Sequence, residues 1–279
     1  MSEADAVALS TRGPVTRQWL RHDLEALGVR PGMLLMVHAS LSGLGWVIGG
    51  PVTVVDALRD AVGESGTLVM PAFCGSNSEP GNWQAPAVPE SWWPTIRAEM
   101  PAFDPRTSPS RIMGAVAEYF RTLPGVLRSA HPAQSWAALG PLAEQLTSNH
   151  SLDCRDGDDT PLGRSYQLDG HVLCLATRRT TVLHLADFRC EWPGKHTKRA
   201  GSAALIDGER RWVEYQDDWS DGEDFEQIRL DFMASRPPAD DSWREGPVAY
   251  STSRLLAIRP LVDFAVGWMK RHRTAGTDA

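Results

Sequence analysis

The chain has 279 residues, which is enough to bury a large hydrophobic core. Its net charge of −7 argues against a nucleic-acid partner, because proteins that bind nucleic acids present a basic surface. No apolar run is long enough to span a membrane, and the four cysteines lack the close spacing of zinc sites. Since no signal peptide is recognisable either, we expect a cytoplasmic protein with reduced thiols, no metal and no membrane partner.

The first third of the chain predicts a strand–helix–strand unit behind an amphipathic helix. In chain order, the four elements are a helix at 16–27, a strand at 33–37, a helix at 53–62 and a strand at 66–71. Both strands are short apolar runs bounded by turn residues, which is typical of strands buried on both faces. This order favours two parallel strands joined by a crossover helix, as in α/β sheets.

The rest of the chain adds long insertions to this unit. Residues 74–110 are rich in Pro, Gly, Ser and Trp and predict an irregular excursion, which in a compact protein is usually functional. The further elements expected are a helix at 113–122, a strand at 171–176, a hairpin at 203–215 around Asp207-Gly208, and helices at 225–235 and 259–273. We therefore expect one α/β domain over residues 14–273, between mobile ends at 1–13 and 274–279.

A segment rich in hydroxyl groups follows the first predicted strand, where His38, Ser40, Leu41 and Ser42 precede several glycines. Ligands of open α/β sheets gather at the carboxyl ends of the strands, where small residues let backbone N–H groups approach phosphate oxygens. The segment matches neither the Gly-x-Gly-x-x-Gly pattern nor a P-loop. The alternative to a phosphate site is therefore an ordinary turn between a strand and a helix.

A second candidate for phosphate binding is a compact set of hydrogen-bond donors further along the chain. It consists of Arg128, Ser129, His131 and Ser135. An arginine can bind a phosphate group through two N–H groups at once, and the proline at 132 restricts the backbone before it. The alternative interpretation is a helix-capping loop that carries a surface arginine.

His184 and Asp187 are three residues apart, a spacing that puts both side chains on one face of a helix. In that arrangement the carboxylate can fix the tautomer of the imidazole and favour its protonated form, which suits a general base. The same spacing also fits a solvated ion pair or half of a metal site. Spacing alone favours one of these structural interpretations over catalysis.

An acidic run at 214–226 contains Asp217 and Asp218 and no Lys or Arg. A run of this kind is usually a solvated face, but its charge also suits the docking of a polycation. A second acidic cluster at 153–159 fails the spacing of an EF-hand loop, so we do not interpret it as a calcium site.

Taken in order, these motifs resemble the aminoglycoside 3-N-acetyltransferase family, part of the antibiotic N-acetyltransferase superfamily and distinct from GNAT-type acetyltransferases. The resemblance runs from about residue 16 to residue 270. The segments that carry it are Val37-His38-Ala39-Ser40-Leu41-Ser42, Gly66-Thr67-Leu68-Val69-Met70-Pro71, Phe103-Asp104-Pro105, Met113-Gly114, Arg128-Ser129-Ala130-His131-Pro132 with Ser135 and Gly140, and Leu183-His184-Leu185-Ala186-Asp187. It implies a single α/β domain with a central mixed sheet, flanking helices and long insertions.

The resemblance implies transfer of an acetyl group from acetyl-coenzyme A to the 3-amino group of the 2-deoxystreptamine ring. His184, supported by Asp187, would be the general base, and His38 would be a second active-site histidine. The implied contacts with coenzyme A are Ser40, Leu41, Ser42, Arg128, Ser129, His131 and Ser135. The implied contacts with the cationic sugar are Glu90, Trp92, Asp217 and Asp218.

Three positions depart from the family pattern. Ala39 replaces a common serine, Asp187 stands where Glu is usual, and the turn at 176–180 replaces a glycine-rich one. We expect an acetyltransferase that inactivates aminoglycoside antibiotics and so confers resistance, without metal or nucleic acid. The alternatives are acetylation of a different amine and a protein that binds cationic sugars without turnover. The sequence leaves the oligomeric state open.

Overall fold

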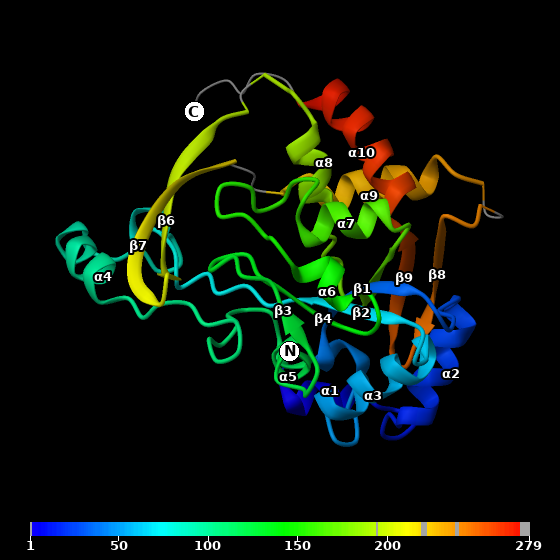
Figure 1. Ribbon diagram of the computed structural model, residues 1–279. Helices are drawn as coiled ribbons and strands as arrows, with labels where there is room; N and C mark the ends of the chain where they lie inside the picture. The colour runs from blue at the N-terminus through cyan, green and yellow to red at the C-terminus, as the bar shows by residue number, and fades with distance from the viewer. Residues whose placement is uncertain (1, 194, 219–221, 238–239, 274–279) are drawn as a thin grey trace.

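The computed structural model describes residues 2–193, 195–218, 222–237 and 240–273 (Figure 1). Its centre is a seven-stranded sheet with the strand order β3-β4-β2-β1-β5-β9-β8. The strands are β1 (Leu34–Ala39), β2 (Thr67–Pro71), β3 (Leu127–Arg128), β4 (Trp136–Leu139), β5 (His171–Leu175), β8 (Trp243–Val248) and β9 (Ser251–Ala257). Strands β2 and β5 run parallel to β1, and the outer pairs are antiparallel. The expected mixed α/β sheet is confirmed.

The strand–helix–strand unit predicted near the N-terminus is present as β1, α3 (Pro51–Val62) and β2. It is preceded by α2 (Arg17–Leu27), which begins after Thr16, whose side chain accepts a hydrogen bond from the backbone N–H of Trp19. The helix ends at Gly28, which adopts the left-handed conformation with a φ of 110° that glycine tolerates best. Local sequence signals are sufficient to set both ends of this helix.

Alternate residues of β1 face two separate layers of helices, because successive side chains of a strand point to opposite faces. Leu35 and Val37 pack with α2, α3 and α5 (Ala115–Arg121), whereas Leu34 and Met36 pack with the second layer. The second layer is formed by α6 (Ala143–Thr147), α7 (Pro161–Gln167), α8 (Leu183–Arg189), α9 (Phe225–Ala234) and α10 (Ile258–His272). Figure 1 shows the two layers below and above the sheet.

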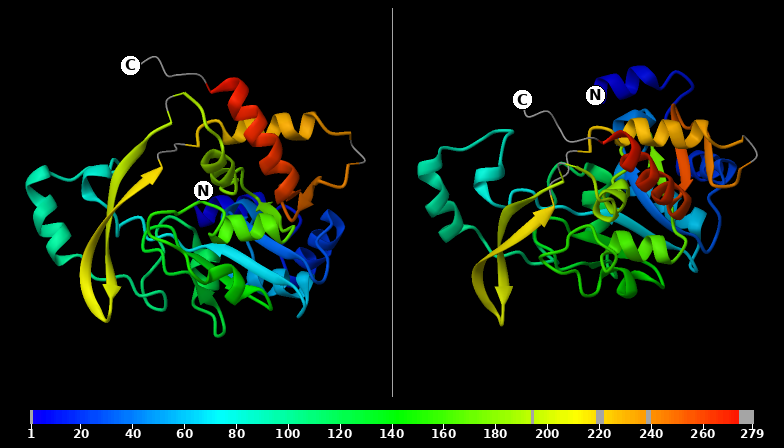
Figure 2. Two further views of the ribbon diagram at one scale, coloured as in Figure 1. Left: turned by 45° about the horizontal axis from the view of Figure 1, so that its top comes forward. Right: turned by 90° about the horizontal axis from the view of Figure 1, so that it is seen from above.

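A two-stranded ribbon, β6 (Thr197–Ile206) and β7 (Glu209–Asp218), stands apart from the sheet (Figure 2). It turns at Asp207-Gly208, both with positive φ, so the predicted hairpin is confirmed and is longer than expected. The excursion at 74–110 packs along this ribbon and includes η2 (Pro80–Asn82), η3 (Glu90–Trp92) and α4 (Trp93–Glu99). The side chain of Asn77 joins the two by bonding the backbone N–H and C=O of Ala203 at 2.8 Å each.

The N-terminal residues form a helix, α1 (Glu3–Leu9), within the stretch 1–13 for which the sequence predicts a mobile end. Ser2 and Asp5 cap the first turn reciprocally, a capping-box signal that the sequence analysis did not use. The predicted C-terminal end at 274–279 lies outside the described residues. Within the described part of the chain, no helix combines the length and apolar character needed to cross a membrane.

Candidate active site

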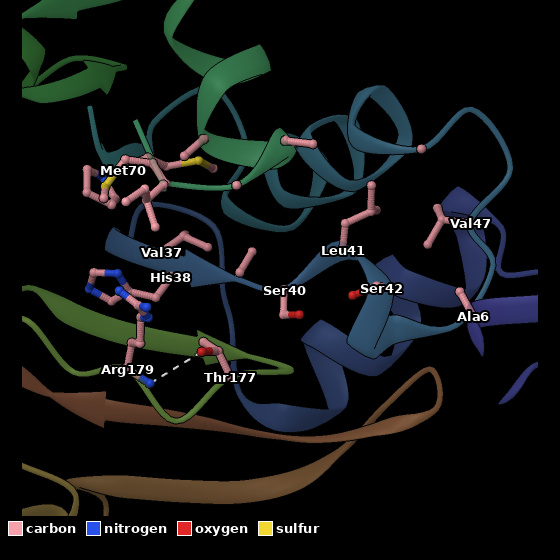
Figure 3. Close-up of a pocket in the computed structure, with 18 of the residues that line it drawn as sticks. Ala6, Val37, His38, Ser40, Leu41, Ser42, Val47, Met70, Thr177 and Arg179 are labelled. Atoms are coloured by element: carbon pink, nitrogen blue, oxygen red, sulfur yellow. Dashed lines mark hydrogen bonds between the residues drawn. The ribbon is translucent and has the colours of Figure 1, made fainter. Parts of the chain in front are cut away.

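A large cavity lies at the carboxyl ends of the parallel strands and has a volume of about 760 Å³. This is where ligands of α/β sheets are expected. Its walls come from the end of β1, the turn after it, residues 112–115 and the turn between β5 and α8 (Figure 3). The three predicted residues Ser40, Leu41 and Ser42 all line it.

The turn after β1 is held tightly against the turn after β5. The backbone N–H of Ser40 donates to the carbonyl of Leu175 at 3.0 Å, which continues the pairing of the two strands. The next turn, η1 (Leu41–Leu44), contains Gly43, where an added Cβ would lie 3.0 Å from the carbonyl oxygen of Ala176. A side chain there would push the two turns apart, so glycine keeps the hydroxyl groups of Ser40 and Ser42 at the cavity.

His38 is buried at the end of β1 and lines the cavity. It lies on the same face of the strand as Leu34 and Met36, which pack against α8. Its Nε2 is 3.0 Å from the hydroxyl of Thr181. Burial lowers the pKa of His38 to about 4, with smaller electrostatic contributions from Arg179 and His184. The ring is therefore neutral at pH 7.

His184, the second residue of α8, lines both this cavity and a smaller one on its other side. The Phe225 ring packs against it edge to face, with ring centroids 4.8 Å apart. In the described part of the chain its Nδ1 is buried without a hydrogen-bond partner. Burial also lowers the pKa of His184, so the imidazole is neutral near pH 7 and has a nitrogen free to accept a proton.

Asp187 does not hold the His184 ring, and this prediction is wrong for the structure. Its Oδ1 is bound by the guanidinium of Arg273, which also donates to both carboxylate oxygens of Asp224, at 2.8 and 2.9 Å. The physical reason is burial: a carboxylate that is 3% exposed needs a full cation as its partner, and a neutral imidazole is not one. Asp187 still acts on His184 through space, because its charge opposes the lowering of the His184 pKa.

The smaller cavity, of about 160 Å³, is acidic. Asp217 and Asp218, both predicted for substrate binding, line it together with His184. Burial raises the pKa of Asp217 to about 6. The cavity also holds residues that the sequence analysis did not assign, namely Asp153, Arg155 and Asp156. Their signal was the acidic cluster at 153–159, which we considered only as a calcium loop.

Two basic side chains already pair with the acids of the smaller cavity. Arg155 lies 2.8 Å from Asp217 and 2.9 Å from Asp156, and Lys195 lies 3.7 Å from Asp218. A cationic ligand would therefore share or displace these partners rather than meet bare carboxylates. The two cavities meet at His184, so a group in the acidic cavity and a group in the large one can both approach its ring.

The structure places Arg128, the predicted phosphate contact, away from the large cavity. The Arg128 guanidinium is occupied inside the protein: its Nε donates to Ser135 at 2.9 Å, and its Nη atoms donate to the carbonyls of Ala72 and Ser108. Neither Arg128 nor Ser135 lines the large cavity. The sequence could not distinguish an arginine that binds a ligand from one that satisfies buried carbonyls, because both need the same donors.

Ser129 and His131 are also buried away from the cavity, with exposures of 0%. His131 accepts from the N–H of Gln134 at 3.0 Å and faces the carbonyl of Leu152 at 3.2 Å. The Ser129 hydroxyl lies 2.9 Å from Nδ1 of His150, whose Nε2 faces the carbonyl of Arg155 at 3.0 Å. Because each Nε2 faces a carbonyl, both rings are Nε2–H tautomers with no nitrogen left for a cofactor.

Glu90 and Trp92 do not reach either of the two cavities in the described structure. Both are exposed in η3, beside α4, and Figure 2 places α4 on the outer side of the ribbon. Here the long excursion packs on the ribbon instead of folding over the site: Arg210 of β7, for instance, donates to the backbone carbonyls of Arg97 and Met100.

Comparisons with known proteins agree with this geometry. Residues 36–270 match the model of the family described as aminoglycoside 3-N-acetyltransferase. The chain is 40% identical to aminoglycoside N(3)-acetyltransferase VII of Streptomyces paromomycinus over 284 aligned positions, covering 95% of this chain and 96% of the relative. The crystal structure of YokD from Bacillus subtilis is 36% identical, with a TM-score of 0.91 over 96% of this chain and 98% of that one. The structure titled AAC-IIIb binary with CoASH is 32% identical, with a TM-score of 0.82 over 95% and 100% of the two chains.

Proposed function

The chain belongs to the aminoglycoside 3-N-acetyltransferase family and so is an enzyme that acetylates aminoglycosides from acetyl-coenzyme A, and we propose that His184 is its general base. The observation that carries this assignment is that His184 lines both cavities. An acyl transfer between two substrates needs one proton acceptor within reach of both, and His184 is placed for that task.

We assign the acetyl donor to the large cavity. A cavity of about 760 Å³ lies within the usual range for sites that enclose a cofactor-sized ligand. Its lining is largely apolar, with hydroxyl groups from Ser40, Ser42 and Thr181, which suits the mixed polar and apolar character of the pantetheine arm. The donor would lie with its thioester at the end occupied by His38 and His184.

The amine would enter from the acidic cavity. An amino group of the aminoglycoside is mostly protonated at pH 7, so His184 must first take its proton, directly or through a water. The nitrogen lone pair then attacks the carbonyl carbon of the thioester and the new C–N bond forms. When the C–S bond breaks, the sulfur leaves as a thiolate and takes the proton back from His184. The nitrogen, which carries a positive charge after the attack, loses one further proton to water as the neutral amide forms. The ammonium group and the thioester thus give the amide, the free thiol of coenzyme A and one H⁺.

The carboxylates of Asp217 and Asp218 would bind further ammonium groups of the sugar and so orient one amine toward His184. Asp156, which shares the acidic cavity, would add to this field. Arg155 and Lys195 keep the carboxylates paired until a polycation arrives. The proposal includes a cytoplasmic location, with which four unpaired cysteines agree, because thiols stay reduced there.

The proposal is tested by following the release of coenzyme A thiol from acetyl-coenzyme A with a panel of amines. We expect release with aminoglycosides that carry 2-deoxystreptamine and none with an aminoglycoside that lacks its 3-amino group. Release of thiol only with other amines would support the acetyltransferase chemistry but contradict the assignment of aminoglycosides as the substrate. No release with any amine, together with tight binding of aminoglycosides, would favour a sequestering protein.

The role of the base is tested by replacing each buried histidine in turn. For His184→Ala we expect turnover to fall by about 10²–10⁴-fold, the usual contribution of a general base. The same variant should still bind aminoglycoside, because the acidic residues remain. Near-normal turnover of His184→Ala beside a collapse in His38→Ala would move the role of base to His38.

A further inference from the structure

Arg179 is the only Arg or Lys among the described residues that line the large cavity. It lies in the turn between β5 and α8, the segment at 176–180 that departs from the family pattern noted in the sequence. This turn also supplies Thr177 and Thr181 to the cavity. A single cation in a cavity for an anionic donor has two candidate partners, the phosphate groups and the oxygen of the reacting carbonyl.

The Arg179 guanidinium has no partner in the described part of the chain: no hydrogen bond and no ion pair involves its side chain, and the residue is exposed. Its neighbour differs in this respect, because Arg178 turns away and pairs with Glu226 at 3.4 Å. An exposed arginine without a partner at the lining of a cavity is free to meet a ligand there.

The position of Arg179 along the cavity favours the reacting end. Figure 3 shows its side chain extending toward the imidazole of His38, with Ser40 and Ser42 in the middle and Val47 and Ala6 at the far end. The charge of Arg179 also acts on His38. For proton transfer, the thioester of the donor must lie beside His38 and His184. The Arg179 guanidinium would then be close to the thioester carbonyl and far from the nucleotide of the donor.

We propose that Arg179 donates an N–H group to the thioester oxygen and stabilises the negative charge that develops there. The inference rests on the proposed function. When the amine attacks, the C=O π electrons move to oxygen and give an alkoxide beside the guanidinium. When the C=O bond re-forms, the C–S bond breaks and that charge leaves with the sulfur. Donors placed at such an oxygen supply much of the rate enhancement in acyl transfer.

The test compares Arg179→Gln and Arg179→Ala with the control Arg178→Ala, which removes the same charge one residue away. For both Arg179 variants we expect kcat to fall by about 10²-fold, the loss caused by removing one oxyanion donor. The KM for acetyl-coenzyme A should change by less than about 3-fold, because the interaction forms only in the transition state. Arg178→Ala should keep the kinetics of the unmodified enzyme.

A second readout separates chemistry from folding. Adding guanidinium at millimolar concentration to Arg179→Ala should restore part of kcat, whereas it should leave the kcat of Arg178→Ala unchanged and should not raise the kcat of His184→Ala. A large rise in KM with unchanged kcat would overturn the proposal and assign Arg179 to the phosphates. Unchanged kinetics of both Arg179 variants would also overturn it. If the unmodified enzyme releases no thiol with any amine, the proposed function fails first, independently of Arg179.

Discussion

Asp187 has two candidate partners for its buried charge, the His184 ring one turn earlier and the Arg273 guanidinium at the end of α10. Arg273 forms the ion pair and is itself held by Asp224 and by the face of Trp192, 5.1 Å from its ring centroid. Asp187 pairs with the permanent cation because a neutral imidazole does not compensate the charge of a carboxylate that is buried away from water. Asp187 therefore tunes His184 through its field, and Arg273 sets how much of that field His184 feels.

Replacing Arg273 with Gln should raise the pKa of His184. Arg273 now lowers that pKa and Asp187 raises it, so losing the cation leaves the carboxylate unopposed. On the acid side of the pH profile, kcat/KM falls as the base of the free enzyme becomes protonated, and this fall should shift to higher pH. Asp187→Asn should shift the same fall to lower pH. The measurement is the pH profile of kcat/KM for both variants.

The control for this pair is Arg271→Gln, which removes an exposed charge from the same end of α10. It should leave the pH profile unchanged. Identical pH profiles for Arg273→Gln and Asp187→Asn would contradict the opposite pKa shifts expected for His184.

The free energy of unfolding of Arg273→Gln should fall by about 3–5 kcal/mol, since Asp187 would be left buried and unpaired. Urea unfolding checks this.

Among the elements, α1 has an unexpected role as the outer wall of the large cavity. Glu3 and Ala6 line it, and the helix is fixed to the turn before α3 by the Ser10 hydroxyl, which accepts from the N–H of Trp46 at 2.7 Å. The wall lies at the end of the cavity away from His38 and Arg179 (Figure 3). Changes in α1 should therefore affect binding of the donor and leave the chemical step alone.

We expect Ala6→Glu to raise the KM for acetyl-coenzyme A by about 10-fold or more while kcat stays within about 2-fold, the pattern of lost uniform binding. The new carboxylate narrows the cavity and repels the anionic nucleotide. Val7→Glu is the matched control, because it adds the same charge to the same helix at an exposed position outside the cavity lining. Equal KM values for the two variants would contradict the assignment of α1 as a wall of the donor site.

The elements predicted from sequence are those with a strong local signal. The helix α2, the strands β1 and β2 and the Asp207-Gly208 turn carry clear periodicity or punctuation, and all are confirmed. The strand β4 is only four residues long and pairs with β2, which lies far earlier in the chain, so this pairing could not be foreseen. The strand β8 pairs with its neighbour β9, but it contains Gly and Pro and so lacks the apolar alternation that predicts a strand.

The site residues also differ in whether a local sequence signal or the distant parts of the fold decide their position. Ser40 and Ser42 were predicted because they stand directly after a strand, a position that local sequence fixes. His184 was singled out by its spacing from Asp187 and assigned as the base only through the family resemblance. Arg128 was expected at the site and Arg179 was not. Whether an arginine meets a ligand depends on which carbonyls the fold brings around it, and those carbonyls belong to segments that lie far away in the sequence.

At the scale of the whole molecule, several histidines are folded in the neutral state. Burial lowers the pKa of His131 to about 3 and the pKa of His38 and His150 to about 4. Burial also lowers the pKa of His171 and of His184. Each of these rings binds a proton more readily in the unfolded chain than in the folded protein. The free energy of unfolding therefore depends on pH.

These shifts predict that stability falls as the pH drops from 7 to 5. In this window the unfolded chain binds protons at His38, His131 and His150 while the folded protein does not, so the free energy of unfolding decreases. Asp217 opposes this, because its folded pKa of about 6 lets the folded state bind a proton first. The three histidines against Asp217 give a net loss of at least about 4 kcal/mol, to which His171 and His184 add with the same sign. Glu118, whose pKa is lowered to about 2, acts only below this window.

Urea unfolding at pH 7, 6 and 5 measures this slope, and His150→Gln tests its origin. His150→Gln should be less stable at pH 7, because its bonds to Ser129 and to the Arg155 carbonyl are disturbed, but its slope between pH 7 and 5 should be smaller by about one proton. His22→Gln replaces an exposed histidine and should keep the full slope. A free energy of unfolding that stays constant from pH 7 to pH 5 would show that these rings accept protons in the folded state. The tight packing of the loop at 148–156 around His150 would then have to loosen in acid without unfolding the sheet, which amide hydrogen exchange of that loop would detect.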